Sequence, residues 1–335
     1  MNLTSTLLPL IDLSRKDDGS IAKTAFVQDV AEGLGHDPKH LSSRYFYDST
    51  GSRLFQQIME LPEYYLTRAE FEIFTRQKQG ITEHFASGGF FHLIDLGAGD
   101  ALKTKILLRH LQSEKQQFDY VPVDISGDAM QQLTTSLKAE MPGMQLQAVV
   151  GEYFEALEWL HEHKSERKVV LFLGSNIGNF SPSQSIIFLK KIRSYLQSGD
   201  KLLLGVDLRK DPKTILSAYD DAAGVTAAFN LNLLERINRE LGANFDLGKF
   251  RHFATYQPHE GVMKSYLISQ EEQHVHIKAI DRILKFSAWE AIHMENSYKY
   301  SLQQVKELGQ TCGFNTETVF KDSQQYFADI LFSVN

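Results

Sequence analysis

The sequence contains a single cysteine, Cys312, among its 335 residues. One cysteine cannot form an internal disulfide, so we expect the chain to work in a reducing, cytoplasmic environment. The amino-terminal stretch lacks the basic segment and the long apolar run of a signal peptide. No apolar run approaches the roughly 18 residues that a membrane-spanning helix needs. The sequence therefore disfavours a disulfide-rich secreted protein and a membrane protein.

Clusters of basic residues are also missing. Lysine and arginine number 35 against 42 aspartate and glutamate residues, which gives a formal net charge of −7. The basic side chains occur singly or in short scattered pairs, so we expect no binding to nucleic acid. The chain is 42% hydrophobic and has no repeat or Pro/Ser-rich linker, which is typical of a globular protein of about two domains. We expect a monomer.

Short apolar runs that end in Asp or Gly alternate with stretches of helical periodicity. This alternation predicts βαβ units and a mostly parallel, Rossmann-like α/β sheet. The predicted strands cover residues 90–96, 118–123, 144–150, 168–174 and 201–207, with helices at 127–140 and 182–196. A helix at 302–312 and strands at 317–320 and 326–334 then complete the sheet.

The alternation stops after Asp207, and residues 209–298 read as an inserted α+β lobe. Helices are expected there at 214–221 and 225–241, and strands at 252–257, 261–269 and 274–279. We assign residues 65–208 and 299–335 to the sheet domain and residues 209–298 to a substrate-binding lobe. The amino-terminal segment 1–64 is expected to contribute to that lobe. Ligand sites favour domain interfaces, so we expect the substrate between the two.

A glycine turn follows the first predicted strand of the sheet. Gly97 and Gly99 stand where a backbone approaches a ligand at the carboxyl end of a strand. A dinucleotide-binding turn has a third glycine three residues later, but position 102 is Leu, so a pyrophosphate is disfavoured. Asp124, 25 positions after Gly99, ends the next strand and suits ribose hydroxyls. Adenosine without phosphates indicates S-adenosylmethionine; the alternative is a turn with no ligand.

Other residues near this turn have two readings each. Glu152 ends the third strand and either meets the adenine amino group or is a solvated loop residue. Lys103 is either a solvated helix residue or a partner of the cofactor carboxylate. The histidine pairs at 161/163 and 274/276 lack a third ligand at suitable spacing, so we expect no metal site. Cys312 is read as a packing residue.

Seven polar strings distinguish the sequence from a generic α/β protein. The strings are 43–55 (SRYFYDSTGSRLF), 61–70 (LPEYYLTRAE), 172–182 (FLGSNIGNFSP), 204–211 (LGVDLRKD), 218–230 (AYDDAAGVTAAFN), 238–241 (NREL) and 294–300 (MENSYKY). Together they resemble the histidine N-alpha-methyltransferase family of ergothioneine biosynthesis, in the same order from about residue 40 to the carboxyl terminus.

The resemblance implies transfer of three methyl groups from S-adenosylmethionine to the α-amino group of L-histidine, which gives hercynine. It places Tyr64 and Tyr219 at the reacting amine. The implied substrate residues are Tyr47, Tyr64, Asn179, Tyr219, Met263, Glu295 and Ser297. The implied cofactor residues are Gly97, Gly99, Lys103, Asp124, Glu152 and Tyr153. The sequence departs from close relatives at Glu152, where they carry Asp, and in the residues that flank Glu295.

The chemistry of an imidazole supports part of this set. A neutral imidazole offers one N–H donor and one acceptor, which a carboxylate and an amide can read. Glu295 and Asn179 supply these two groups, with Ser297 as a supporting hydroxyl. Glu295 and Ser297 are two residues apart and so share one face of an extended segment. The alternatives are a solvated Glu295, core packing for Tyr64 and Tyr219, and a helix N-cap for Asn179.

Two other functions remain open at this point. The first is an N-methyltransferase of the same family acting on another amino acid, such as a tryptophan derivative. The second is a catalytically silent protein that binds S-adenosylmethionine and regulates a partner. A carboxylate at Glu295 fits imidazole better than indole, and the second-lobe polar residues are all present, so histidine methylation is favoured.

Overall fold

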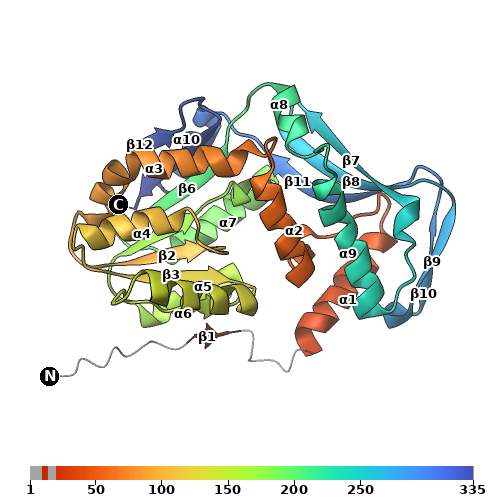
Figure 1. Ribbon diagram of the computed structural model, residues 1–335, viewed down its shortest axis with the longest axis horizontal. Coiled ribbons are helices and arrows are strands. Elements are labelled where there is room, and N and C mark those ends of the chain that lie inside the picture. Colours follow the sequence, from red (N-terminus) through yellow and green to blue (C-terminus); the bar gives the residue numbers. More distant parts are fainter. Residues whose placement is uncertain (1–9, 14–19, 335) are drawn as a thin grey trace. The chain divides into compact units, whose positions relative to one another are not determined.

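The computed structural model describes residues 10–13 and 20–334 (Figure 1). The described residues form two compact units. The first, here called the sheet unit, holds residues 10–13, 66–209 and 300–334. The second, here called the insert unit, holds residues 20–65 and 210–299. Within the described residues, no helix combines the length and apolar character that a membrane span requires.

The sheet unit is built on eight strands in the order β1-β4-β3-β2-β5-β6-β13-β12. Neighbours from β1 to β6 are parallel, whereas β13 runs antiparallel to both β6 and β12. The bounds are β1 Ile11–Asp12, β2 Phe91–Leu96, β3 Phe118–Asp124, β4 Val149–Val150, β5 Lys168–Phe172, β6 Lys201–Asp207, β12 Asn315–Lys321 and β13 Phe327–Ser333. The chain winds outward from β2 in both directions, so the strand order reverses between β2 and β5.

Helices cover both faces of this sheet (Figure 1). One face carries α3 Tyr65–Ala86, α4 Thr104–Ser113 and α5 Gly127–Glu140, whose apolar residues share a core with alternate residues of the central strands. A second group of helices consists of α6 Tyr153–His163, α7 Pro182–Ser194 and α10 Leu302–Thr311, in which α7 packs against both α6 and α10. Phe188 of α7 lies 4.7 Å from Phe172 at the end of β5, measured between ring centroids. Such two-sided burial explains the almost uninterrupted apolar runs of β2, β5 and β6.

The insert unit is α+β. Strands β7 Phe250–Gln257, β8 Val262–Ser269 and β11 Ala291–Tyr298 form an antiparallel sheet in the order β11-β8-β7, and β9 Gln273–Ile277 pairs with β10 Arg282–Phe286. Its helices are α1 Ser20–Gly35, α2 Ser49–Glu60, α8 Pro212–Ser217 and α9 Val225–Leu241. Helix α9 contacts α2, β7 and β8 and thereby joins the amino-terminal part of this unit to its sheet.

Short 3-10 turns complete the chain at Ser43–Tyr45, Asn176–Asn179, Leu247–Lys249 and Lys278–Ile280.

The predicted α/β class and most predicted elements are confirmed, and α9 matches its predicted range. Two expectations are wrong. Residues 144–150 form a strand only at Val149 and Val150. Leu146 makes no more than an isolated bridge to Tyr120 of β3. Ile11 and Asp12 pair with Val149 and Val150, so this part of the segment 1–64 adds a strand to the sheet.

A tight approach in the insert unit yields a prediction of stability. A methyl group at Gly51, in the first turn of α2, would overlap the carbonyl oxygen of Phe46, whereas one at Gly127 in the first turn of α5 would meet nothing within 4 Å. We expect Gly51→Ala to lower the free energy of unfolding by about 1–3 kcal/mol. Gly127→Ala should leave it unchanged or slightly raised. Denaturant titration compares the two, and equal effects would contradict the prediction.

Candidate functional site

The glycine turn after β2 is held by the strand end beside it. Gly97 and Gly99 have φ of +77° and +53°, a region that glycine enters without steric cost. The Asp124 carboxylate at the end of β3 accepts hydrogen bonds from the Gly99 amide at 3.1 Å and the Ser126 amide at 2.9 Å. A side chain at Gly99 would meet no atom of the described residues within 4 Å, so the turn has open space where a ligand would approach. Burial raises the pKa of Asp124.

A second buried carboxyl group, that of Asp95 in β2, stabilises the same turn. Asp95 accepts hydrogen bonds from the Thr104 hydroxyl at 2.7 Å and the Tyr120 hydroxyl at 2.8 Å. Burial raises the pKa of Asp95 to about 6 despite these donors. The turn between β2 and α4 is therefore fixed at both ends before any ligand arrives.

Tyr153, predicted from the resemblance to contact the cofactor, lies against this turn. A methyl group at Gly97 would stand 2.9 Å from the Tyr153 hydroxyl, so this ring requires a glycine there. Burial raises the pKa of the Tyr153 hydroxyl above its usual range, which keeps it protonated. Glu152, just before it, is exposed, and its amide donates to the Glu155 carboxylate at 3.4 Å at the start of α6. Its role toward adenine stays a prediction.

The solvated alternative for Lys103 is wrong. Its ammonium group forms an ion pair with Glu70 of α3, a side chain with no exposed surface. Glu70 also accepts the Gly174 amide, at 2.9 Å and 3.1 Å from its two oxygens. One carboxylate thus joins the turn after β2 to the loop after β5, on either side of the point where the strand order reverses. In such sheets ligands bind at this point.

The loop after β5 carries Asn179. Its backbone is unusual, since Gly174 and Ser175 have φ of +70° and +60°, and the Ser175 hydroxyl accepts the Asp207 amide at 2.9 Å. The N-cap alternative for Asn179 is wrong, because Ser181 caps α7 by accepting the Gln184 amide at 3.3 Å. Asn179 is only partly buried at the end of its 3-10 turn. The amide is therefore not used to start a helix.

The remaining predicted substrate residues all lie in the insert unit, where aromatic contacts connect several of them. The Tyr47 ring is 5.5 Å from Phe55 and 5.7 Å from Phe229, between centroids. Phe55 is 6.3 Å from Tyr64, which in turn is 6.3 Å from Tyr219. The structure thus brings together three tyrosines that the sequence separates by up to 172 positions (219 minus 47).

Strand β11 presents polar side chains at alternate positions beside this cluster. The Ser297 hydroxyl lies 2.8 Å from the Tyr219 hydroxyl, and Met263 pairs with Ser297 across the sheet. Lys299, 2% exposed, donates to the Tyr219 hydroxyl at 2.7 Å and to Ser297 at 2.8 Å. Glu295 and Ser297 are two residues apart and share one face of β11, and Lys299 follows directly after the strand.

The Glu295 carboxyl group differs from the Ser297 hydroxyl and the Lys299 ammonium in its lack of hydrogen-bond partners among the described residues. In the part of the chain that the structure describes, its carboxyl group has no hydrogen-bond partner. Burial raises the pKa of Glu295 to about 7, and the positive charge of Lys299 offsets this only in part. The carboxyl group is therefore poised to change its charge state near neutral pH and to accept a donor from a ligand.

The sequence reasoning missed Glu70, Asp329 and Lys299. Glu70 and Lys299 lie in two of the quoted polar strings, so the strings gave a signal that was not followed. Asp329 sits in an otherwise apolar strand and is fully buried, and a charged residue in such a run is itself a signal. His252 was also missed: its Nε2 donates to the Tyr219 carbonyl at 2.9 Å, and burial lowers its pKa.

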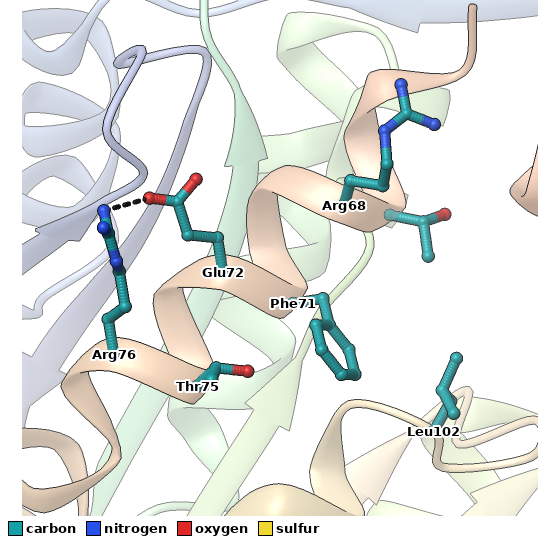
Figure 2. Close-up of a pocket in the computed structure, with 7 residues that line it drawn as sticks. Arg68, Phe71, Glu72, Thr75, Arg76 and Leu102 are labelled. Atoms are coloured by element: carbon teal, nitrogen blue, oxygen red, sulfur yellow. Dashed lines mark hydrogen bonds and ion pairs between the residues drawn. The ribbon is translucent and has the colours of Figure 1, made fainter. Parts of the chain in front are cut away.

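A surface hollow of about 370 Å³ lies along the outer side of α3 (Figure 2). Phe71 and Leu102 extend into it, and Glu72 pairs with Arg76 at 2.7 Å on its rim. None of the predicted cofactor or substrate residues lines this hollow. It is a feature of the exposed face of α3, opposite to the face that carries Glu70.

The sheet order and the glycine turn, with an acidic residue at the next strand end, define a methyltransferase that uses S-adenosylmethionine. The family model for histidine-specific, S-adenosylmethionine-dependent methyltransferases matches residues 26–334. The chain belongs to this family.

Curated relatives carry names consistent with this family. The histidine N-alpha-methyltransferase of Mycolicibacterium smegmatis is 40% identical over 284 residues, which cover 85% of this chain and 87% of the relative. Ergothioneine biosynthesis protein 1 of Neurospora crassa is 29% identical over 88% of this chain, which spans 33% of that protein. The 4-dimethylallyltryptophan N-methyltransferase of Epichloe festucae var. lolii is 25% identical over 88% of this chain and 90% of that relative.

Solved structures resemble the chain more distantly. The magnesium protoporphyrin IX methyltransferase from Synechocystis, with bound S-adenosylhomocysteine, aligns with a TM-score of 0.45 and 10% identity over 87% of this chain and 97% of that one. A glycopeptide N-methyltransferase complexed with sinefungin aligns with a TM-score of 0.41 and 12% identity over 78% and 86% of the two chains.

The contacts of Asp124 predict its contribution to cofactor affinity. We expect Asp124→Ala to weaken S-adenosylhomocysteine by about 1.5–3 kcal/mol, the size of a charge-assisted hydrogen bond. Asp100→Ala is the control, because Asp100 belongs to the same turn but, among the described residues, accepts only the Leu102 amide, at 3.0 Å. Titration calorimetry measures both. Unchanged affinity in Asp124→Ala would remove this residue from the site.

The raised pKa of Glu295 predicts how stability depends on pH. Because the folded state keeps the Glu295 proton up to about pH 7 and the unfolded state releases it near 4.5, this group lowers stability as pH rises between those values. Glu295→Gln cannot ionise, so its unfolding free energy relative to the native chain should rise by on the order of 1–3 kcal/mol between pH 5 and 8. Denaturant titrations at both pH values check this. If the unfolding free energies of the two proteins changed in parallel with pH, the pKa of Glu295 would not be raised.

Proposed function

We propose that the chain methylates the α-amino nitrogen of L-histidine three times and releases hercynine. The observation that carries the substrate assignment is the polar row of β11 beside the tyrosine cluster, with a carboxyl group that lacks a partner among the described residues. The family, and the 40% identity to a histidine N-alpha-methyltransferase, support the same substrate.

The residues of the sheet unit fit S-adenosylmethionine. The open side of Gly99, the Asp124 carboxylate beside it and the Tyr153 ring against Gly97 form a cradle that a side chain at either glycine would change. We assign the ribose hydroxyls to Asp124 and the methionine carboxylate to Lys103. The bound cofactor supplies an electrophilic methyl group on a sulfonium centre.

The residues of the insert unit hold and orient the amino acid. Glu295 and Ser297 would read the imidazole, since a carboxyl oxygen accepts the ring N–H and a hydroxyl donates to the other nitrogen. Met263 would pack against the ring, and Tyr47, Tyr64 and Tyr219 would line the amine. Asn179 belongs to the sheet unit, and its contact with the substrate stays a prediction.

Methyl transfer needs a neutral amine whose lone pair points at the methyl carbon. Tyr219 accepts a hydrogen bond from Lys299. We assign the Tyr219 oxygen to accept a hydrogen bond from an N–H of the amine, which leaves the nitrogen lone pair free for the methyl carbon, with Tyr64 as the second oxygen. Low exposure of both tyrosines keeps water away from this point.

Product analysis tests the proposal directly. After incubation of the chain with S-adenosylmethionine and each of the twenty amino acids, mass spectrometry should find three added methyl groups on histidine alone. Methylation of tryptophan instead would favour the activity of the more distant tryptophan-type relatives. Binding of S-adenosylhomocysteine without any product would indicate a catalytically silent protein.

The selectivity for histidine should depend on Glu295. A site built to hydrogen-bond a substrate group rejects analogues that lack it, because its own polar groups are left unpaired. Glu295→Ala should lower kcat/KM for histidine by roughly 2–4 kcal/mol, and lower any residual rate with tryptophan far less. Glu290→Ala is a matched control, since Glu290 pairs with Lys39 and belongs to no predicted site. Equal losses with both substrates would show that Glu295 supports the fold only.

A further inference from the structure

Two buried carboxyl groups meet beneath the loop that follows β5. Glu70 of α3 and Asp329 of β13 both have no exposed surface. Gly205 of β6 pairs with Asp329 across the sheet and lies between them. A methyl group at Gly205 would press on Glu70 Oε1 and stand 3.1 Å from Asp329 Oδ1. The glycine therefore leaves room for the two acids to approach each other.

Of the two acids, only Glu70 has hydrogen-bond donors among the described residues. Glu70 accepts the Gly174 amide and pairs with the Lys103 ammonium. Neither oxygen of Asp329 accepts a hydrogen bond from a donor among the described residues. A buried carboxylate without donors costs several kcal/mol, so Asp329 is expected to hold a proton. The neutral acid then donates that proton to Glu70, and burial together with the Glu70 charge raises the pKa of Asp329 well above its usual value.

From this arrangement we infer that Glu70 is a positioning residue for cofactor binding: it holds Lys103 toward the methionine carboxylate, and a protonated Asp329 holds Glu70. The inference rests on the proposed assignment of Lys103 to that carboxylate.

The balance of charge supports a positioning role. Glu70 and Lys103 carry one negative and one positive charge, and Asp329 carries none. The Lys103 ammonium has three N–H donors, so the pair with Glu70 leaves donors for a ligand. Lys103 would otherwise be a long flexible side chain at the edge of the turn, and ordering it in advance reduces the entropy lost on binding. The Asp95 carboxyl group also faces this cluster, and the charge of Glu70 contributes to raising its pKa.

A pair of ligands separates positioning of Lys103 from general damage to the site. S-adenosylhomocysteine carries the carboxylate, whereas its decarboxylated analogue keeps the amine and the adenosine but lacks that group. Calorimetry with both gives a selectivity ratio for the carboxylate. In Glu70→Gln this ratio should fall about tenfold, as expected for loss of a charge-assisted contact. Lys103→Gln should lower it to a similar extent, and the double variant should add nothing further.

Asp329→Asn distinguishes the protonated acid from an ionised one. An amide keeps a donor for Glu70 without adding charge, so the ratio should stay within about threefold of the native value. Glu72→Gln is the matched control on α3, because Glu72 lies at the surface and pairs with Arg76 (Figure 2). Its ratio should be unchanged. Where Glu70→Gln does not fold, Glu70→Asp, which keeps the charge but withdraws it from Lys103, replaces it.

Two results would overturn the inference. One is an unchanged selectivity ratio for the carboxylate in the folded Glu70 variant. The other is a fall of this ratio in Asp329→Asn that equals the fall in Glu70→Gln. A native chain that binds neither ligand would instead contradict the assignment of the cofactor site, so the two failures remain distinguishable.

Discussion

A buried carboxyl group must find donors, and this requirement fixes the carboxyl edge of the sheet. Asp95 takes two hydroxyl groups, Asp124 takes two backbone amides, and Glu70 takes one amide and an ammonium. Asp95 and Glu70 lie on one element and their donors on others, whereas Asp124 accepts the Gly99 amide of the neighbouring turn and the Ser126 amide of its own. Because leaving any of these acids unpaired would cost several kcal/mol, the turns after β2, β3 and β5 hold one relative geometry. The glycines then provide space within that geometry.

The sheet was predictable because its information is local. Strands buried on both faces are continuous apolar runs, and the acidic and glycine residues that end them mark the carboxyl edge. Residues 144–150 mislead this reasoning, since an apolar run does not show whether a neighbouring strand is available along its whole length. The roles of Glu70 and Asp329 were not predictable in the same way. Asp329 is 259 positions from Glu70 (329 minus 70), and only the sheet pairing of β13 with β6 brings it there.

The insert unit shows the same limit for its polar residues. The alternation along β11 predicts that Glu295 and Ser297 share a face, but it does not identify Lys299 as a buried cation. A buried lysine is stable there because Tyr219 and Ser297 accept its hydrogen bonds. Tyr219 comes from the segment before α9, far away in the sequence. The polar strings predicted these residues through resemblance, whereas their mutual contacts follow only from the fold.

Glu70 and Glu295 illustrate how partners separate a supporting acid from a binding one. Glu70 is fully buried and has an amide and an ammonium as partners, whereas Glu295 is partly buried and has only the charge of Lys299 in the described part of the chain. A satisfied carboxylate gains little from a ligand, so Glu70 suits a positioning role. An unsatisfied one gains a hydrogen bond from a ligand that the described residues of the protein do not provide. Its pKa near 7 also lets Glu295 ionise when an imidazole brings an N–H donor, so charge develops only where a ligand stabilises it.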